Sequence, residues 1–123
     1  MKISRLPAAW IATLACAAAT LPVGHAQNSG NATPRERAGA VAYGQHCSAC
    51  HGVRLMKSGD AHDITGFAAA VDEERFARTA KIARGAMPSF ARTLTDQTLG
   101  DIHIYVKRGH TPDLDDVPME SNH

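Results

Sequence analysis

Two cysteines and a histidine lie within five residues of each other in the stretch GQHCSACHGV, which spans residues 44–53. Cys47 and Cys50 are three residues apart, and His51 follows directly. Three chemistries use such a C-x-x-C pair: thiol–disulfide exchange, zinc binding, and covalent attachment of haem when histidine comes next. The rest of the sequence distinguishes among these three chemistries.

Zinc and thiol exchange fit the surrounding sequence poorly. Zinc prefers four ligands, and residues 27–123 contain neither a second C-x-x-C pair nor an H-x-x-x-H pattern. Thiol exchange normally places the pair in a strand and helix context, whereas here a helix is predicted before Cys47 and no strand-like alternation is present. Covalent haem attachment is therefore the prediction.

The spacing of the three residues suits a haem c group. Cysteines three residues apart on one helical turn project to the same side, so both thiols can add to the vinyl groups along one haem edge. His51 then lies beneath the ring, where an imidazole nitrogen binds the iron. We predict one covalent haem c per chain, attached at Cys47 and Cys50 with His51 as an axial ligand.

The other face of the iron needs a second donor, which we predict to be Met87. In the stretch RGAMPSF, Gly85 and Pro88 flank this methionine and predict an extended turn that lays the thioether across the far haem face. A lone methionine more often packs in a core, so the interpretation depends on the haem site. The competing donors are Met56, Met119, His62, His103 and His110.

Single histidines in a chain that has seven lie more often at the surface than at a metal. We also expect His46, directly before the first cysteine, to face solvent.

Residues 1–26 have the features of a signal peptide. Two basic residues and an apolar run over residues 6–23 precede small residues that suit cleavage after Ala26. The alternatives are a retained anchor, because the run reaches the lower limit of a membrane span, and lipid attachment at Cys16. We predict export to the periplasm, an oxidising compartment in which haem attachment would occupy both thiols.

Cleavage would remove two basic residues and leave 11 against 12 acidic ones, so the exported chain is nearly neutral. No basic excess predicts nucleic-acid binding, and we expect no membrane span in the mature chain.

The elements that position these residues are predicted to be helices. Residues 27–33 are polar and predict a flexible lead-in to a domain over residues 34–110. One helix starts at Pro34 with Thr33 as N-cap, a second follows Asp72 and runs to Gly85, and a third follows Thr95 and ends before Gly109. Residues 53–71 predict a loop with one short turn at most, and residues 111–123 a flexible acidic tail. The fold class is all-α.

The motifs together resemble those of the class I cytochrome c family over residues 34–109. Gly39 and Tyr43, ahead of CSACHG, resemble the Gly-x-x-x-Tyr/Phe pattern of the family's N-terminal helix. LTDQTLGDIHIYVK resembles its C-terminal helix, and ARGAMPSF its Gly-x-Met-Pro loop. The resemblance implies a cytochrome c fold in which three to four helices surround the haem and the terminal helices cross, with Ile102 and Tyr105 against Gly39.

One position departs from the resemblance. Many family members have proline where this chain has His62, and the carbonyl of that proline accepts a hydrogen bond from the axial histidine. The carbonyl of His62 is therefore a candidate acceptor for His51.

The predicted function is single-electron transfer rather than enzymatic catalysis. The chain would accept electrons from a periplasmic dehydrogenase, or serve as its cytochrome subunit, and pass them toward a terminal oxidase. A basic docking rim is predicted from Arg54, Lys57, Arg84 and Arg92, with scattered solvated charges as the alternative reading. The alternative function is a haem enzyme or gas-binding sensor with an open sixth position.

Overall fold

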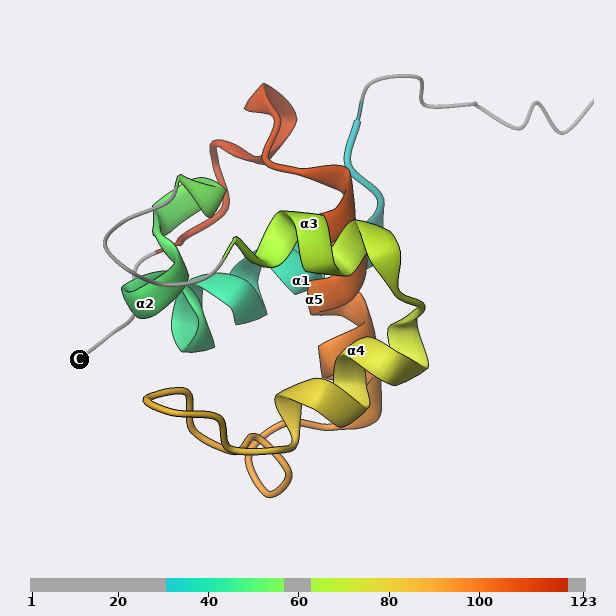
Figure 1. Ribbon diagram of the computed structural model, residues 1–123. Helices are drawn as coiled ribbons and strands as arrows, with labels where there is room; N and C mark the ends of the chain where they lie inside the picture. The colour runs from blue at the N-terminus through green and yellow to red at the C-terminus, as the bar shows by residue number, and fades with distance from the viewer. Residues whose placement is uncertain (1–30, 57–62, 120–123) are drawn as a thin grey trace, which may run out of the picture.

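The computed structural model describes residues 31–56 and 63–119, and these form an all-helical domain (Figure 1). The elements are α1 (Pro34–His46), α2 (Ser48–His51), η1 (Val53–Leu55), α3 (Ile64–Ala70), α4 (Glu73–Ala80), α5 (Asp96–Arg108) and η2 (Pro112–Leu114). The described residues contain no strand, which confirms the predicted fold class. No helix among them has the length and apolar character needed to span a membrane. The predicted signal peptide lies outside the described residues.

Helix α1 begins where its sequence predicts. The Thr33 hydroxyl accepts a hydrogen bond from the Glu36 N–H at 3.2 Å, and the Glu36 carboxylate accepts one from the Thr33 N–H at 2.6 Å. This reciprocal pair is a capping box, and it satisfies two of the amides that a helix start leaves without partners. Pro34 occupies the first turn, where its fixed φ and missing N–H are tolerated.

Helices α1 and α5 cross at Gly39. A Cβ atom on this glycine would lie 1.9 Å from the Asp101 carbonyl oxygen and 3.0 Å from Cβ of Tyr105. The rings of Tyr43 and Tyr105 pack beside the crossing with centroids 5.3 Å apart. The predicted crossing and the contact with Tyr105 are confirmed, and the atom nearest to the Gly39 Cβ position is the Asp101 carbonyl oxygen, one residue before Ile102.

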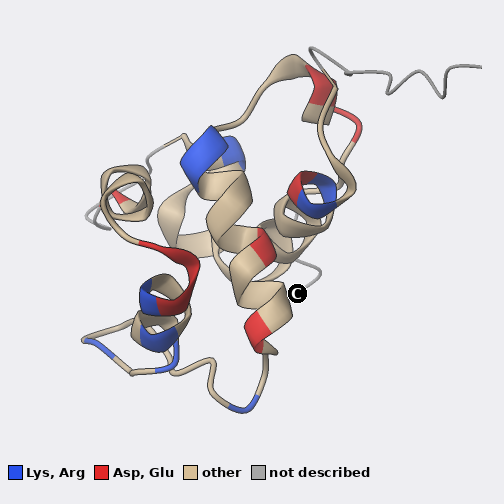
Figure 2. Ribbon diagram, turned by 90° about the vertical axis from the view of Figure 1, so that its right-hand side faces the viewer, with Lys and Arg blue, Asp and Glu red and all other residues tan. Residues whose placement is uncertain are grey.

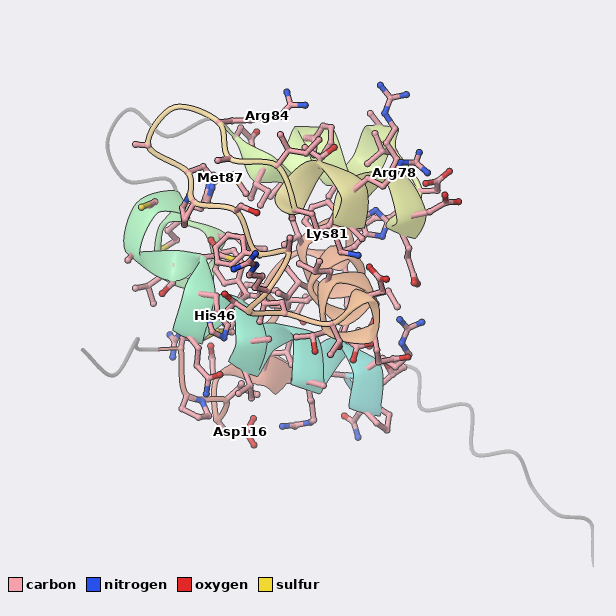
Figure 3. The ribbon with its side chains drawn as sticks, turned by 90° about the horizontal axis from the view of Figure 1, so that it is seen from below. His46, Arg78, Lys81, Arg84, Met87 and Asp116 are labelled. Carbon is pink, nitrogen blue, oxygen red and sulfur yellow. The ribbon has the colours of Figure 1, made fainter. Side chains whose placement is uncertain are left out.

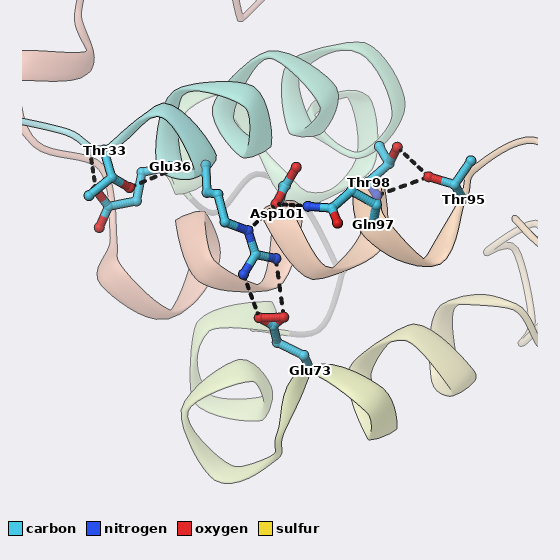
Figure 4. Close-up of polar contacts among 8 residues, drawn as sticks. Thr33, Glu36, Glu73, Thr95, Gln97, Thr98 and Asp101 are labelled. Carbon is cyan, nitrogen blue, oxygen red and sulfur yellow. Dashed lines mark hydrogen bonds and ion pairs between the residues drawn. The ribbon is translucent and has the colours of Figure 1, made fainter.

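A polar network on the outside of this crossing joins α1, α4 and α5 (Figure 4). The Arg35 guanidinium donates to Asp101 at 2.6 Å and to the two carboxylate oxygens of Glu73 at 3.1 and 3.2 Å. A Cβ on Gly100 would lie 2.9 Å from Glu73 Oε2 and 3.1 Å from Arg35 Nη2. The interior glycine of α5 thus leaves room for this ion-pair network, which links the three helices.

The structure differs from the sequence prediction over residues 53–71. We expected a loop, and residues 64–70 form α3 instead, because Asp63 caps the helix by accepting from the Thr65 N–H at 2.9 Å. At its other end, His103 Nε2 lies 2.9 Å from the Ala68 oxygen and 3.0 Å from the Val71 oxygen. Carbonyls only accept, so Nε2 carries the proton, and His103 is a buried cap for α3 rather than a surface residue.

Helix α4 begins after Asp72 as predicted but ends at Ala80, short of the predicted end near Gly85. Residues 81–95 then form an irregular connection to α5, whose N-cap is Thr95 as predicted.

The segment after α5 also differs from the expected flexible tail over residues 111–119. Leu114, Val117 and Met119 are buried in the same core as the helices. The Met119 backbone lies so close to α1 that a Cβ on Gly44 would come within 2.6 Å of it. Burial of these three apolar side chains favours an ordered segment. The sequence did not predict this because acidic residues lie between them and mask any apolar period.

Ion pairs hold this acidic segment on the domain. Arg37 pairs with Asp116 at 3.1 Å, Arg54 pairs with Asp115 at 3.5 Å, and Arg108 pairs with Asp113 at 3.1 Å. The cations come from α1, η1 and α5, so the segment connects three parts of the fold.

Asp113 predicts a loss of stability in acid. The neighbouring Thr111 side chain and the Arg108 guanidinium lower the pKa of Asp113 from its ordinary 3.8 to about 2. A lowered pKa in the folded state stabilises the fold at higher pH, and this contribution is lost as the pH falls from about 5 to 2. Asp113→Asn should therefore flatten the fall in the free energy of unfolding over that range, measured by denaturant titration. An unchanged fall would show that Asp113 is not responsible.

Candidate functional site

A cavity of about 620 Å³ lies between the ends of α1 and α2 on one side and the connection from α4 to α5 on the other. This volume is within the range of about 300–1,000 Å³ that is typical of ligand pockets. Its inner surface is mostly apolar and is formed by side chains from α3, α4, α5 and the connection, among them Phe67, Phe76, Phe90, Leu99 and Ile102. The cavity suits a large apolar group.

The three predicted attachment residues lie together on the α1–α2 wall. Cys47, Cys50 and His51 all line the cavity, and both cysteines are free thiols. Helix α2 is a single turn that ends at Gly52, where φ is +92°. The buried Tyr43 hydroxyl donates to the Gly52 carbonyl at 2.7 Å and so fixes the end of this turn to α1.

The environment of Cys47 opposes thiol–disulfide exchange. Burial, with a smaller contribution from the neighbouring Cys50, raises the pKa of the Cys47 thiol to about 12. Cysteines that exchange disulfides have lowered pKa values, because the thiolate is the attacking species. Burial therefore disfavours the thiolate form of Cys47, the form that attacks in thiol–disulfide exchange. Among the residues that the structure describes, no three His, Cys, Asp or Glu side chains are grouped to hold a metal ion.

Met87 lines the opposite wall of the cavity. Arg84 and Met87 exchange two backbone hydrogen bonds of 3.0 and 2.9 Å across a two-residue turn. Gly85, the first central residue, has a φ of +57°, and Ala86 is not among the residues with positive φ. Positive φ at the first central position alone is the type II′ pattern, which favours glycine there. A tight turn, rather than the expected extended one, presents Met87 to the cavity (Figure 3).

His46 also lines the cavity, which corrects the expectation that it faces solvent. Its ring packs edge-on against Phe90, with centroids 6.3 Å apart. The helical period could have predicted this position, because His46 lies three residues after Tyr43 and seven after Gly39 and so shares the buried face of α1.

The other candidate donors in the described residues lie away from the cavity. Met56 is 67% exposed, and Met119 is buried with the C-terminal segment. The His110 ring lies between the Tyr105 hydroxyl at 3.2 Å and the Asp115 carboxylate at 2.9 Å. His62 lies outside the described residues, so its predicted role at His51 stays a prediction.

These features define a class of protein. An all-helical domain whose first and last helices cross at a glycine, and whose apolar cavity carries a C-x-x-C-H turn, is a c-type cytochrome domain. Residues 34–106 match the model of the family described as cytochrome C oxidase, cbb3-type, subunit III, and the chain belongs to this family. No curated protein and no solved structure matches the chain.

Membership of this family implies haem c binding and electron transfer. The residues that line the cavity fit that group: two free thiols and an imidazole line one wall, a thioether lines the other, and apolar side chains lie between them. When bound, haem supplies an iron centre that gains and loses one electron.

Proposed function

We propose that this chain is a periplasmic single-electron carrier. Haem c would be attached at Cys47 and Cys50, with His51 and Met87 as the axial ligands. The observation that carries the proposal is the position of Met87 across the cavity from the C-x-x-C-H turn. A thioether in that position would close the sixth coordination site of a bound haem, which an enzyme or gas sensor would need to keep open.

The surrounding residues would tune the site for electron transfer. A Met and His ligand pair raises the reduction potential of haem. The buried Phe76 and Phe90, with Ile102 from α5, would exclude water from a bound haem, and such an apolar shell would control the potential further. The Arg35 network and the helix crossing link α1, α4 and α5, the helices around the cavity, and this would limit rearrangement when the charge of a bound haem changes.

The proposed place of the chain is between a periplasmic dehydrogenase and a terminal oxidase. It would accept electrons from the dehydrogenase, either as a free shuttle or as its cytochrome subunit. The name of the matched family refers to an oxidase, and this supports a terminal oxidase as the electron acceptor. The signal-peptide features of residues 1–26 support the compartment. Copurification with a dehydrogenase would distinguish the fixed subunit from the shuttle.

An optical spectrum of the oxidised holoprotein, expressed as the full chain in a host that exports and matures c-type cytochromes, tests the proposal. We expect a low-spin spectrum with a Met-to-iron charge-transfer band. Acid–acetone should fail to extract the haem, because two thioether bonds hold it. A high-spin spectrum would overturn the carrier in favour of an enzyme or sensor with an open sixth position, and extractable haem would overturn attachment at Cys47 and Cys50.

A further inference from the structure

Positive charge is concentrated on the side of the domain that carries Met87. Residues 75–95, which run from α4 to the start of α5, contain five basic residues and no acidic one, although the whole chain has a net charge of only +1. Figure 2 shows this segment as a run of blue positions beyond the acidic start of α4. The five are Arg75, Arg78, Lys81, Arg84 and Arg92.

Three of these cations, Arg75, Arg84 and Arg92, are exposed and have no ion pair with a described residue, and Arg84 and Arg92 are the two that lie closest to Met87 on either side of it in the sequence. Arg78 pairs with Glu74, and Lys81 pairs with Asp96. Arg84 and Arg92 form no ion pair with any residue that the structure describes, and Arg84 also lines the cavity. These two guanidinium groups are therefore available to an anionic partner.

Only some of the residues predicted for the docking rim therefore carry an unpaired charge. Arg54, in η1, is paired with Asp115 of the C-terminal segment. Lys57 lies outside the described residues. The unpaired positive charge of the predicted rim lies, within the described chain, on the Met87 side alone.

The connection folds back on the end of α4 and forms one surface with it. The Phe90 N–H donates to the Ala80 carbonyl at 3.1 Å, and the Ser89 hydroxyl donates to the Lys81 carbonyl. Between the cations the surface is apolar: Ile82 is 54% exposed, and Ala83, Ala86 and Pro88 are exposed as well. We call residues 81–92 the Met87 face. Figure 3 places Arg78, Lys81 and Arg84 in the same half of the view as Met87, with Asp116 at the opposite edge.

We propose that the redox partner docks on the Met87 face and presents an acidic surface to Arg84 and Arg92. This inference rests on the proposed function. Apolar contact at the centre with charged residues at the edge is the usual arrangement of a protein interface. Complementary charges steer the encounter and raise its rate, and salt screens the effect over about 8–10 Å. Docking here would bring the partner against the cavity wall that carries Met87.

Oxidation of the reduced holoprotein by small ions tests the location of this surface. In stopped flow, hexacyanoferrate(III) serves as the anionic oxidant and tris(phenanthroline)cobalt(III) as the cationic one. Each reaction moves one electron from the haem iron to the oxidant and transfers no atom. Arg84→Gln and Arg92→Gln each remove one unpaired charge from the Met87 face. Lys107→Gln is the matched control, because Lys107 is exposed, has no ion pair in the described chain, and lies in the last turn of α5.

We expect Arg84→Gln and Arg92→Gln to slow oxidation by hexacyanoferrate(III) roughly two- to fivefold at low ionic strength and to speed oxidation by the cobalt complex. Lys107→Gln should change either rate by much less, and high salt should remove the differences. Equal effects of all three variants would overturn the inference, because only net charge would then matter. Spectra and midpoint potentials of the same samples separate the two proposals: a high-spin haem contradicts the carrier itself, whereas normal spectra with equal rates contradict only the docking face.

Discussion

Replacing Met87 with alanine is expected to remove the Met-to-iron charge-transfer band and to lower the midpoint potential by on the order of 0.1–0.3 V, within the range of about 0.8 V over which axial ligands set haem potentials. The thioether stabilises the reduced iron, and alanine has no donor to replace it. The turn should persist, because Gly85 and the backbone bonds between residues 84 and 87 are unchanged. The measurements are an optical spectrum of the oxidised variant and a potentiometric titration.

Met56→Ala is the control for this variant. Met56 lies five residues after His51 but is 67% exposed and does not line the cavity, so its loss should leave both the band and the potential unchanged. If Met87→Ala kept a low-spin spectrum and its potential, another donor would hold the sixth position. His46→Ala would then be the next variant, because His46 is a further nitrogen donor at the cavity.

The features that the sequence predicted well depend on neighbours within a few residues. Thr33, Asp72 and Thr95 each cap the helix that follows by accepting from an amide three residues later. Such caps are visible as short patterns because donor and acceptor are close along the chain. The C-x-x-C-H motif and the turn signal at Gly85 are local for the same reason, so residues on both walls of the cavity could be named from the sequence, although the turn is tight rather than extended.

The features that the sequence did not predict depend on distant partners. Helix α3 contains an interior glycine and is only seven residues long, so its local signal is weak, and its end is capped by His103 from α5. The order of residues 111–119 depends on cations of α1, η1 and α5. His46 showed a helical period, but solvent was the simpler expectation for a histidine until the cavity was known. Tertiary contacts override weak local preference in each case.

The substitution Gly39→Ala, at the crossing of α1 and α5, is expected to reduce the stability of the domain more than any other change proposed for it. The new Cβ would lie 1.9 Å from the Asp101 carbonyl oxygen, which belongs to the backbone of α5 and cannot rotate away. The helices must separate, and this would disturb the Tyr43–Tyr105 packing beside the crossing. Overpacking typically destabilises by 1–3 kcal/mol and occasionally more, while alanine returns up to about 1 kcal/mol of helix propensity. A contact of 1.9 Å with backbone places this overpacking at the upper end of its range, so we expect a net loss of about 2 kcal/mol in the free energy of unfolding.

Gly66→Ala provides the matched control, because Gly66 is also a helical glycine but has open space around it. Its Cβ would meet only Asp63 Oδ2, at 3.9 Å, so alanine there should stabilise the domain by up to about 1 kcal/mol. Denaturant titration of both variants as holoprotein compares the two signs directly. Tyr43 holds the Gly52 carbonyl at the end of the attachment turn, so a shifted α1 should also move the midpoint potential of Gly39→Ala and not that of Gly66→Ala. If alanine had the same effect on stability at both positions, the close approach of α1 and α5 would not explain the glycine at position 39.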